Sequence, residues 1–121
     1  MDVPPGSYKF TFAILDPEIY IGASDTGYLV VQESGTQPPL WDVQRLQDNS
    51  YHLKISGQEV TTDGFHVQGI HTEDIHGWTI DPIQELDDKS VVVNIHVKDE
   101  PSKLWNITQS DPGTIVGISR Y

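Results

Sequence analysis

The 121-residue chain contains no cysteine. Disulfide bonds, thiol catalysis and thiolate metal sites are therefore excluded. A chain without cysteine suits a reducing compartment. Its first residues, Met1-Asp2-Val3-Pro4-Pro5-Gly6, have neither the basic start nor the apolar segment of a secretory signal. We therefore expect a cytoplasmic protein.

Long apolar runs and basic residues are also scarce. No apolar stretch approaches the roughly 20 residues that a membrane-spanning helix needs, so we expect no membrane partner. Lysine and arginine together number 7 against 18 aspartates and glutamates, which gives a formal net charge of −11. Proteins that bind nucleic acids or anionic membranes are basic, so this balance argues against both classes.

Helix signals are missing as well. No segment carries an apolar stripe of 3.6-residue period with capping residues. Short alternating segments with turn signals about every ten residues are instead typical of an all-β protein, here one domain over residues 1–121. Strands are expected over residues 8–14, 19–21, 28–31, around 41–43, 51–55, 59–62, 65–67, 78–80, 90–97, 103–108 and 114–119.

All three tryptophans share one local pattern, in which a polar residue and then a β-branched residue follow the tryptophan. In a strand, residues two apart face the same side, so both apolar members can enter one core. The three pairs are Trp41/Val43, Trp78/Ile80 and Trp105/Ile107.

Alternating segments that start at Tyr8, Tyr51 and Val91 divide the chain into three units of roughly forty residues, the size of a four-strand repeat. Three such units predict a β-trefoil, a six-stranded barrel closed at one end by three hairpins. Trp41 and Trp78 should occupy equivalent positions, and Trp105 lies earlier in its unit. The last strand of the third unit is expected to be missing or truncated.

Several ordered motifs resemble the small β-trefoil protease inhibitors of mushrooms, which include the mycocypins and the cospin-like serine protease inhibitors. The resemblance implies a cytosolic, non-catalytic protein that binds a protease through surface loops. Members of the family usually end in a further tryptophan-containing strand. The motifs are Gly6-Ser7-Tyr8-x-Phe10, Tyr20-Ile21-Gly22, Leu40-Trp41-x-Val43 followed by Tyr51-x-Leu53, and Trp105-Asn106-Ile107-x₄-Pro112-Gly113-Thr114.

A carbohydrate-binding β-trefoil lectin is the alternative function. Ricin-type lectins carry Gln-x-Trp, whereas Pro39, His76 and Lys103 stand two residues before the tryptophans here. The motif is therefore absent, which leaves another mode of sugar binding open. Fold alone does not choose between the two functions.

Catalysis and metal binding have weak support. No Gly-x-Ser-x-Gly or phosphate-binding glycine loop is present, so we expect no enzyme and no cofactor. His66, His71 and His76 are five residues apart, a spacing that fits neither one helical face nor one strand face. We therefore predict hydrogen-bonded or solvated histidines and no metal site.

Two proline-stiffened loops of the first unit are the predicted protease-binding loops, the same two that the mycocypins use against papain-like proteases. Neither loop contains the lysine or arginine that a trypsin-like specificity pocket requires, so papain-like cysteine proteases are favoured over trypsin-like serine proteases. The prolines also fit ordinary turns. The loop residues are Leu15, Asp16, Pro17 and Glu18, and Ser34, Gly35, Thr36, Gln37, Pro38 and Pro39.

Overall fold

A computed structural model describes residues 3–12, 19–85 and 90–119 of the chain. These residues form strands and turns with no helix, which confirms the all-β prediction. No helix in this part of the protein therefore has the length and apolar character needed to cross a membrane. The strands are β1 (Gly6–Tyr8), β2 (Ile21–Ala23), β3 (Leu29–Val31), β4 (Trp41–Arg45), β5 (Tyr51–Ile55), β6 (Gln58–Thr62), β7 (Val67–Ile70), β8 (Gly77–Glu85), β9 (Val91–Val97), β10 (Glu100–Asn106) and β11 (Gly117–Ile118).

The expected strand boundaries are matched best where apolar and polar residues alternate without interruption. The strand predicted over residues 51–55 coincides with β5. The prediction over residues 8–14 is wrong in its described part, because β1 ends at Tyr8. Beyond that point the backbone carbonyl of Phe10 accepts the N–H of Ile21 at 2.8 Å. The chain therefore bonds to the first residue of β2 and does not extend β1.

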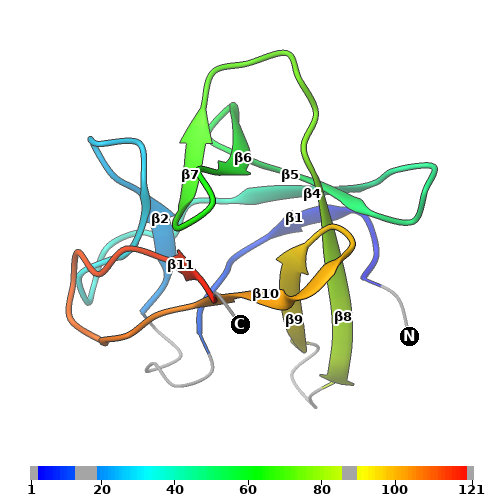
Figure 1. Ribbon diagram of the computed structural model, residues 1–121. Helices are drawn as coiled ribbons and strands as arrows, with labels where there is room; N and C mark the ends of the chain where they lie inside the picture. The colour runs from blue at the N-terminus through cyan, green and yellow to red at the C-terminus, as the bar shows by residue number, and fades with distance from the viewer. Residues whose placement is uncertain (1–2, 13–18, 86–89, 120–121) are drawn as a thin grey trace.

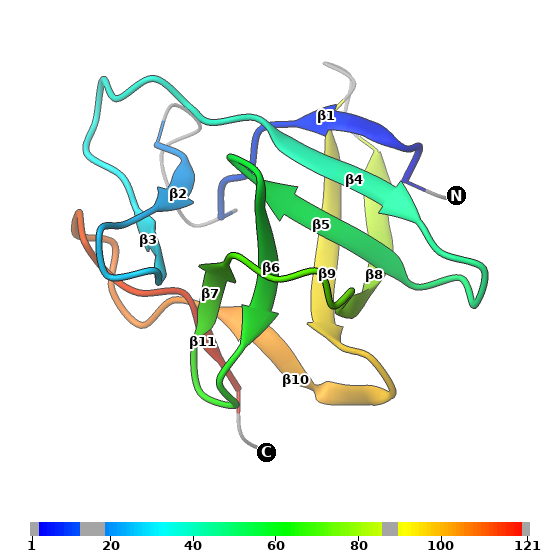
Figure 2. The same ribbon diagram turned by 90° about the horizontal axis from the view of Figure 1, so that it is seen from above.

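The strands are antiparallel and form two sheets, shown in Figures 1 and 2. The larger sheet runs in the order β1-β4-β5-β8-β9-β10-β11, with β6 pairing with β5 and β7. The smaller sheet is the hairpin of β2 and β3. Alternating burial along β4, in which Trp41 and Val43 are buried and their neighbours exposed, shows one face of the sheet turned to the core.

Three hairpins, β2–β3, β6–β7 and β10–β11, contact one another in pairs. Isolated bridges join Tyr28 to Gln68, Val30 to Ile115 and His66 to Gly117, so each hairpin touches the other two. Figure 2 shows β3, β7 and β11 grouped on the same side of the molecule. The core behind them consists mainly of aliphatic residues with two fully buried tryptophans, Trp41 and Trp78.

The two buried tryptophans make matching contacts. The indole N–H of Trp41 donates to the carbonyl of Ile21 in β2 at 3.2 Å, and that of Trp78 donates to the carbonyl of Val60 in β6 at 2.8 Å. Trp105 comes from β10, and its ring packs against both of the others, with ring centroids 5.9 Å from Trp41 and 5.2 Å from Trp78. Buried indole N–H groups need a partner, and these carbonyls supply it.

Candidate functional site

The loop between β3 and β4 projects into solvent. Residues 34–37 are exposed and the two prolines that follow them are half-buried. A tight turn shapes the tip, in which the N–H of Thr36 donates to the carbonyl of Glu33 at 3.1 Å. Gly35 has a φ of +86°, a conformation that favours glycine, and a Cβ added there would meet no atom within 4 Å. The loop therefore has a defined backbone and a free surface.

Both ends of this loop are fixed in the core. Val31 is 1% exposed, and both of its backbone groups bond to the turn at residues 113–114. Its N–H donates to the carbonyl of Thr114 at 2.9 Å, and its carbonyl accepts the N–H of Gly113 at 2.8 Å. Trp41 is fully buried and its ring stacks on Phe10 with the centroids 4.2 Å apart. Residues 32–40 therefore run between two strand ends that are anchored in the core.

The exposed surface of the loop is mainly polar, with one acidic residue and one large apolar residue at its ends. Leu40, which closes the loop, is 58% exposed, and Glu33 is the one charged residue between positions 33 and 40. The other predicted loop residues, Leu15, Asp16, Pro17 and Glu18, lie outside the described residues. The segments that flank them are joined by a bond from the hydroxyl of Thr11 to the carbonyl of Ile19 at 2.5 Å.

Two lysines outside the loop contact carboxylates. Lys98 forms an ion pair with Asp48, which raises the pKa of the ammonium group and lowers the pKa of the carboxyl. Lys103 lies 2.8 Å from Glu100. Neither lysine is therefore presented alone, as the acidic pocket of a trypsin-like protease would require.

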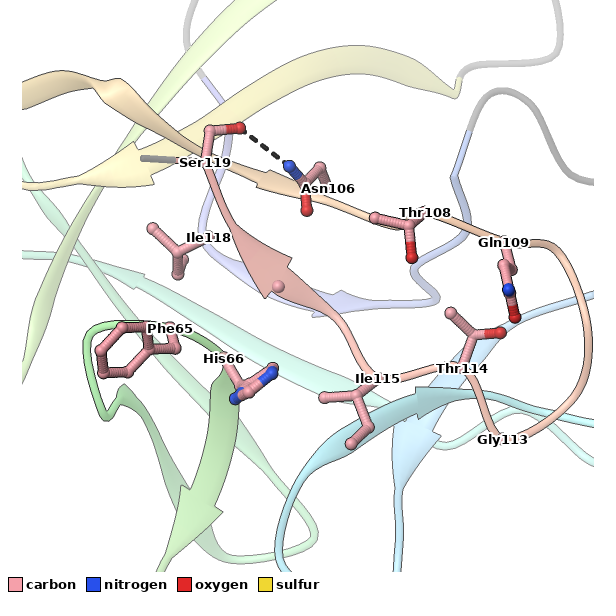
Figure 3. Close-up of a pocket in the computed structure, with 11 residues that line it drawn as sticks. Phe65, His66, Asn106, Thr108, Gln109, Gly113, Thr114, Ile115, Ile118 and Ser119 are labelled. Carbon is pink, nitrogen blue, oxygen red and sulfur yellow. Dashed lines mark hydrogen bonds between the residues drawn. The ribbon is translucent and has the colours of Figure 1, made fainter. Parts of the chain in front are cut away.

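A second candidate site, which the sequence analysis does not identify, is a shallow hollow of about 590 Å³ beside the β10–β11 hairpin (Figure 3). Phe65, in the turn between β6 and β7, is 51% exposed at one end of it. Asn106 donates from its side-chain amide to the hydroxyl of Ser119 at 2.9 Å. The hollow thus combines an exposed aromatic ring with polar groups that neighbouring side chains orient. Its lining also includes His66, Thr108, Gln109, Gly113, Thr114, Ile115, Gly117 and Ile118.

No local sequence pattern predicts this hollow, because its residues come from segments far apart in the chain. Phe65 was expected inside a strand, but β7 begins only at Val67 and the aromatic ring is left in the preceding turn. Asp63 orders that turn by accepting the backbone N–H groups of Phe65 and His66, both at 2.8 Å. Burial opposes a low pKa for Asp63, but these bonds and the nearby imidazole outweigh it and lower the pKa.

The three evenly spaced histidines have three different surroundings. His66 lies beside Asp63 and Tyr28, and His71 lies 3.4 Å from the amide of Gln58. His76 packs on Trp78, with ring centroids 4.7 Å apart, and burial lowers its pKa. Among the described residues, no three histidine or carboxylate side chains are grouped as metal ligands.

None of the protein-family models, curated proteins or solved structures compared with this chain matches it. The resemblance to the mushroom inhibitors thus stays an expectation from the residues that carry it.

Proposed function

We propose that the protein is a non-catalytic binding module that inhibits proteases, with papain-like cysteine proteases as its preferred targets. The loop at residues 34–39 carries the contact, together with residues 15–18. The observation behind this proposal is the exposed, glycine-bent loop fixed between Val31 and Trp41, both of which are almost entirely buried. A preorganised loop loses little conformational entropy when it enters a cleft, so its contacts contribute directly to affinity.

The scaffold we infer is a β-trefoil. Three features support it: three hairpins in mutual contact, a row of five strands in the order β1-β4-β5-β8-β9, and equivalent bonds from Trp41 and Trp78. Functional loops on such a scaffold are held by the sheet beneath them. The inhibitory function therefore needs no chemical group on the protein beyond shape and surface polarity.

The charge of the loop favours papain-like over trypsin-like proteases as targets. A trypsin-like enzyme places an aspartate at the bottom of its specificity pocket, and bringing a carboxylate towards it costs several kcal/mol, on the order of two or more. The loop offers Glu33 and Leu40 and no basic side chain. A papain-like cleft can be blocked by two adjacent loops without a basic anchor, which agrees with this surface.

The decisive variant changes the loop without touching the core. Gly35→Trp places a large side chain at a positive-φ position with open space around it, so it distorts the loop tip while β3 and β4 stay packed. Gly64→Trp is the matched control, because Gly64 also has a positive φ, +96°, and open space, but lies in the turn between β6 and β7.

We expect Gly35→Trp to weaken papain inhibition at least about tenfold, a change of about 1.4 kcal/mol. Gly64→Trp should leave the inhibition constant unchanged. Pro17→Ala tests the second loop in the same assay. Equal effects of the two glycine variants, or trypsin inhibition that disappears when Lys98 or Lys103 is replaced, would move the inhibitory site elsewhere.

Carbohydrate binding is the second candidate function, and the hollow beside Phe65 favours it. An exposed aromatic ring next to amide and hydroxyl groups can stack on the apolar face of a sugar while the polar groups bond its hydroxyls. A glycan array run beside the protease panel separates the two functions. Glycan binding that is lost in Phe65→Ala, with no protease inhibited, would reverse their order.

A further inference from the structure

The large sheet leaves one position between its strands unfilled. β4 pairs with both β1 and β5, and β8 pairs with both β5 and β9. On the side of β9 away from β8, β10 pairs only at its end, through Val97 and His96. Within the described part of the chain, residues 91–94 therefore have no strand on that side. β1 likewise pairs with β4 alone.

β4 lies between β1 and β5, and β8 lies between β5 and β9, with the same register in both cases. This shared register defines how a strand in the unfilled position would pair. The tryptophan of each strand faces one residue on the preceding strand and one on the following strand. For β4 these pairs are Tyr8/Trp41 and Trp41/Ile55, and for β8 they are Tyr51/Trp78 and Trp78/Val97. By the same spacing, a strand in the third position would place one residue opposite both Val93 and Phe12.

The hairpins repeat this pattern in their backbone bonds. Ile21 and Val60, which accept the indole N–H groups, each face a residue whose own N–H bonds to a different hairpin: Val31 to Thr114 O and Gly69 to Gly27 O. In the third hairpin Trp105 faces Ile118, whose N–H donates to Phe65 O at 2.8 Å. The carbonyl of Trp105 is thus directed away from β11, towards the unfilled position.

We propose that the edge formed by β9 and residues 9–12 binds an extended strand of another polypeptide, which completes the sheet. Adding a strand to an open edge supplies backbone hydrogen bonds for affinity, while alternate side chains enter the core and give specificity. The incoming strand carries apolar residues at alternating positions. Because the chain has a net charge of −11, a neutral or basic strand is preferred over an acidic one.

Trp105 sets the size of the inserted side chain. The first two hairpins carry Ile21 and Val60 at the corresponding position, and the larger Trp105 fills more of the core. The residue opposite Val93 is therefore an aliphatic one, smaller than the tryptophan of β4 or β8. Replacing Trp105 by valine should open space for a tryptophan there.

The direction of the backbone N–H and C=O groups of β9 shows which residues would bond to an added strand. In the β4–β5 ladder, the bond from Leu46 N–H to Ser50 O fixes the alternation so that Leu53 directs its backbone groups away from β4. The same alternation in β9 directs Val93 and Ile95 away from β8. Pro82 agrees with it, since it faces Val93 and has no N–H to donate.

The test uses three nine-residue peptides added to the whole protein. The first has the sequence of residues 39–47 with Trp41→Leu, the second keeps the tryptophan, and the third carries serine at both inward positions, Trp41→Ser and Val43→Ser. We expect saturable 1:1 binding of the leucine peptide, measured by calorimetry. The serine peptide should bind at least about tenfold more weakly, and slower amide exchange at Val93 should accompany binding.

Two protein variants complete the test. Val93→Pro removes the N–H that points to the edge and should weaken the leucine peptide at least about tenfold, and Trp105→Val should shift the preference towards the tryptophan peptide. Absence of saturable binding, equal binding of the serine peptide, or unchanged exchange at Val93 overturns the proposal. So does a dimer, detected by sedimentation, that pairs two copies of β9. The papain assay of Gly35→Trp is a separate test, because Gly35 lies in the loop between β3 and β4.

Discussion

The carboxylate of Glu59 lies 2.5 Å from Nε2 of His52, and both side chains are buried. The second carboxylate oxygen accepts the backbone N–H of His76 at 3.1 Å. One acidic residue on β6 therefore connects β5 to the segment that leads into β8. Removing the carboxylate leaves these buried polar groups without their hydrogen-bond partner, which is costly.

Glu59→Ala should destabilise the protein by about 3 kcal/mol, because the imidazole of His52 and the N–H of His76 both lose their acceptor. Urea unfolding followed by circular dichroism measures this change. Glu85→Ala is the control, since Glu85 is an exposed residue of β8, and it should cost less than about 0.5 kcal/mol. Equal losses in the two variants would show that the buried contact contributes nothing to stability.

His76 should make the stability of the protein depend on pH. Burial lowers its pKa below the ordinary value of 6.5, an effect that the neighbouring Glu59 opposes. The unfolded chain then binds a proton more readily than the folded one, so this contribution to stability is complete above pH 6.5 and is lost as the pH falls below it. His76→Phe keeps a ring against Trp78 and removes the titration.

The measurement is the free energy of unfolding at pH 7.5 and at pH 5.5 for the native protein and for His76→Phe. The native protein should lose more stability between the two values than the variant does. Identical losses would mean that other groups account for the pH dependence.

The three tryptophans should differ in their tolerance of phenylalanine. Trp41→Phe and Trp78→Phe each leave a buried carbonyl without its indole donor, which costs about 1–3 kcal/mol in addition to the lost volume. Trp105 has a buried Nε1 with no hydrogen-bond partner among the described residues, so Trp105→Phe removes no such bond. Guanidinium unfolding should show similar losses for the first two variants and a smaller loss for the third. A Trp105→Phe loss equal to the others would contradict this assignment.

Local sequence pattern predicts the strands of this protein well where one face is buried. The alternation around Trp41 and in residues 51–55 corresponds to β4 and β5, and the prediction of strand structure without helices is confirmed. Alternation alone could not show that β1 ends at Tyr8, because Phe10 and Phe12 also pack on the core from an irregular segment. The bond between Phe10 and Ile21 that interrupts the strand depends on tertiary contact.

The candidate sites differ in how far sequence could predict them. The 34–39 loop is local, and its glycine and prolines indicate an exposed turn. The hollow depends on Phe65, Asn106 and Ser119 meeting across two hairpins, which no local pattern reveals. The burial of Glu59 with His52 also depends on the tertiary fold. The sequence around each residue has the pattern of an ordinary half-exposed strand, so it does not predict their contact.

The inhibition constants of the unmodified protein for papain and for trypsin, measured side by side, test the central claim most directly. An exposed, anchored loop without a basic side chain predicts papain inhibition at least about a hundredfold stronger than trypsin inhibition, a difference of about 2.7 kcal/mol. Trypsin inhibited as strongly as papain, or neither enzyme inhibited at micromolar protein, would contradict the account.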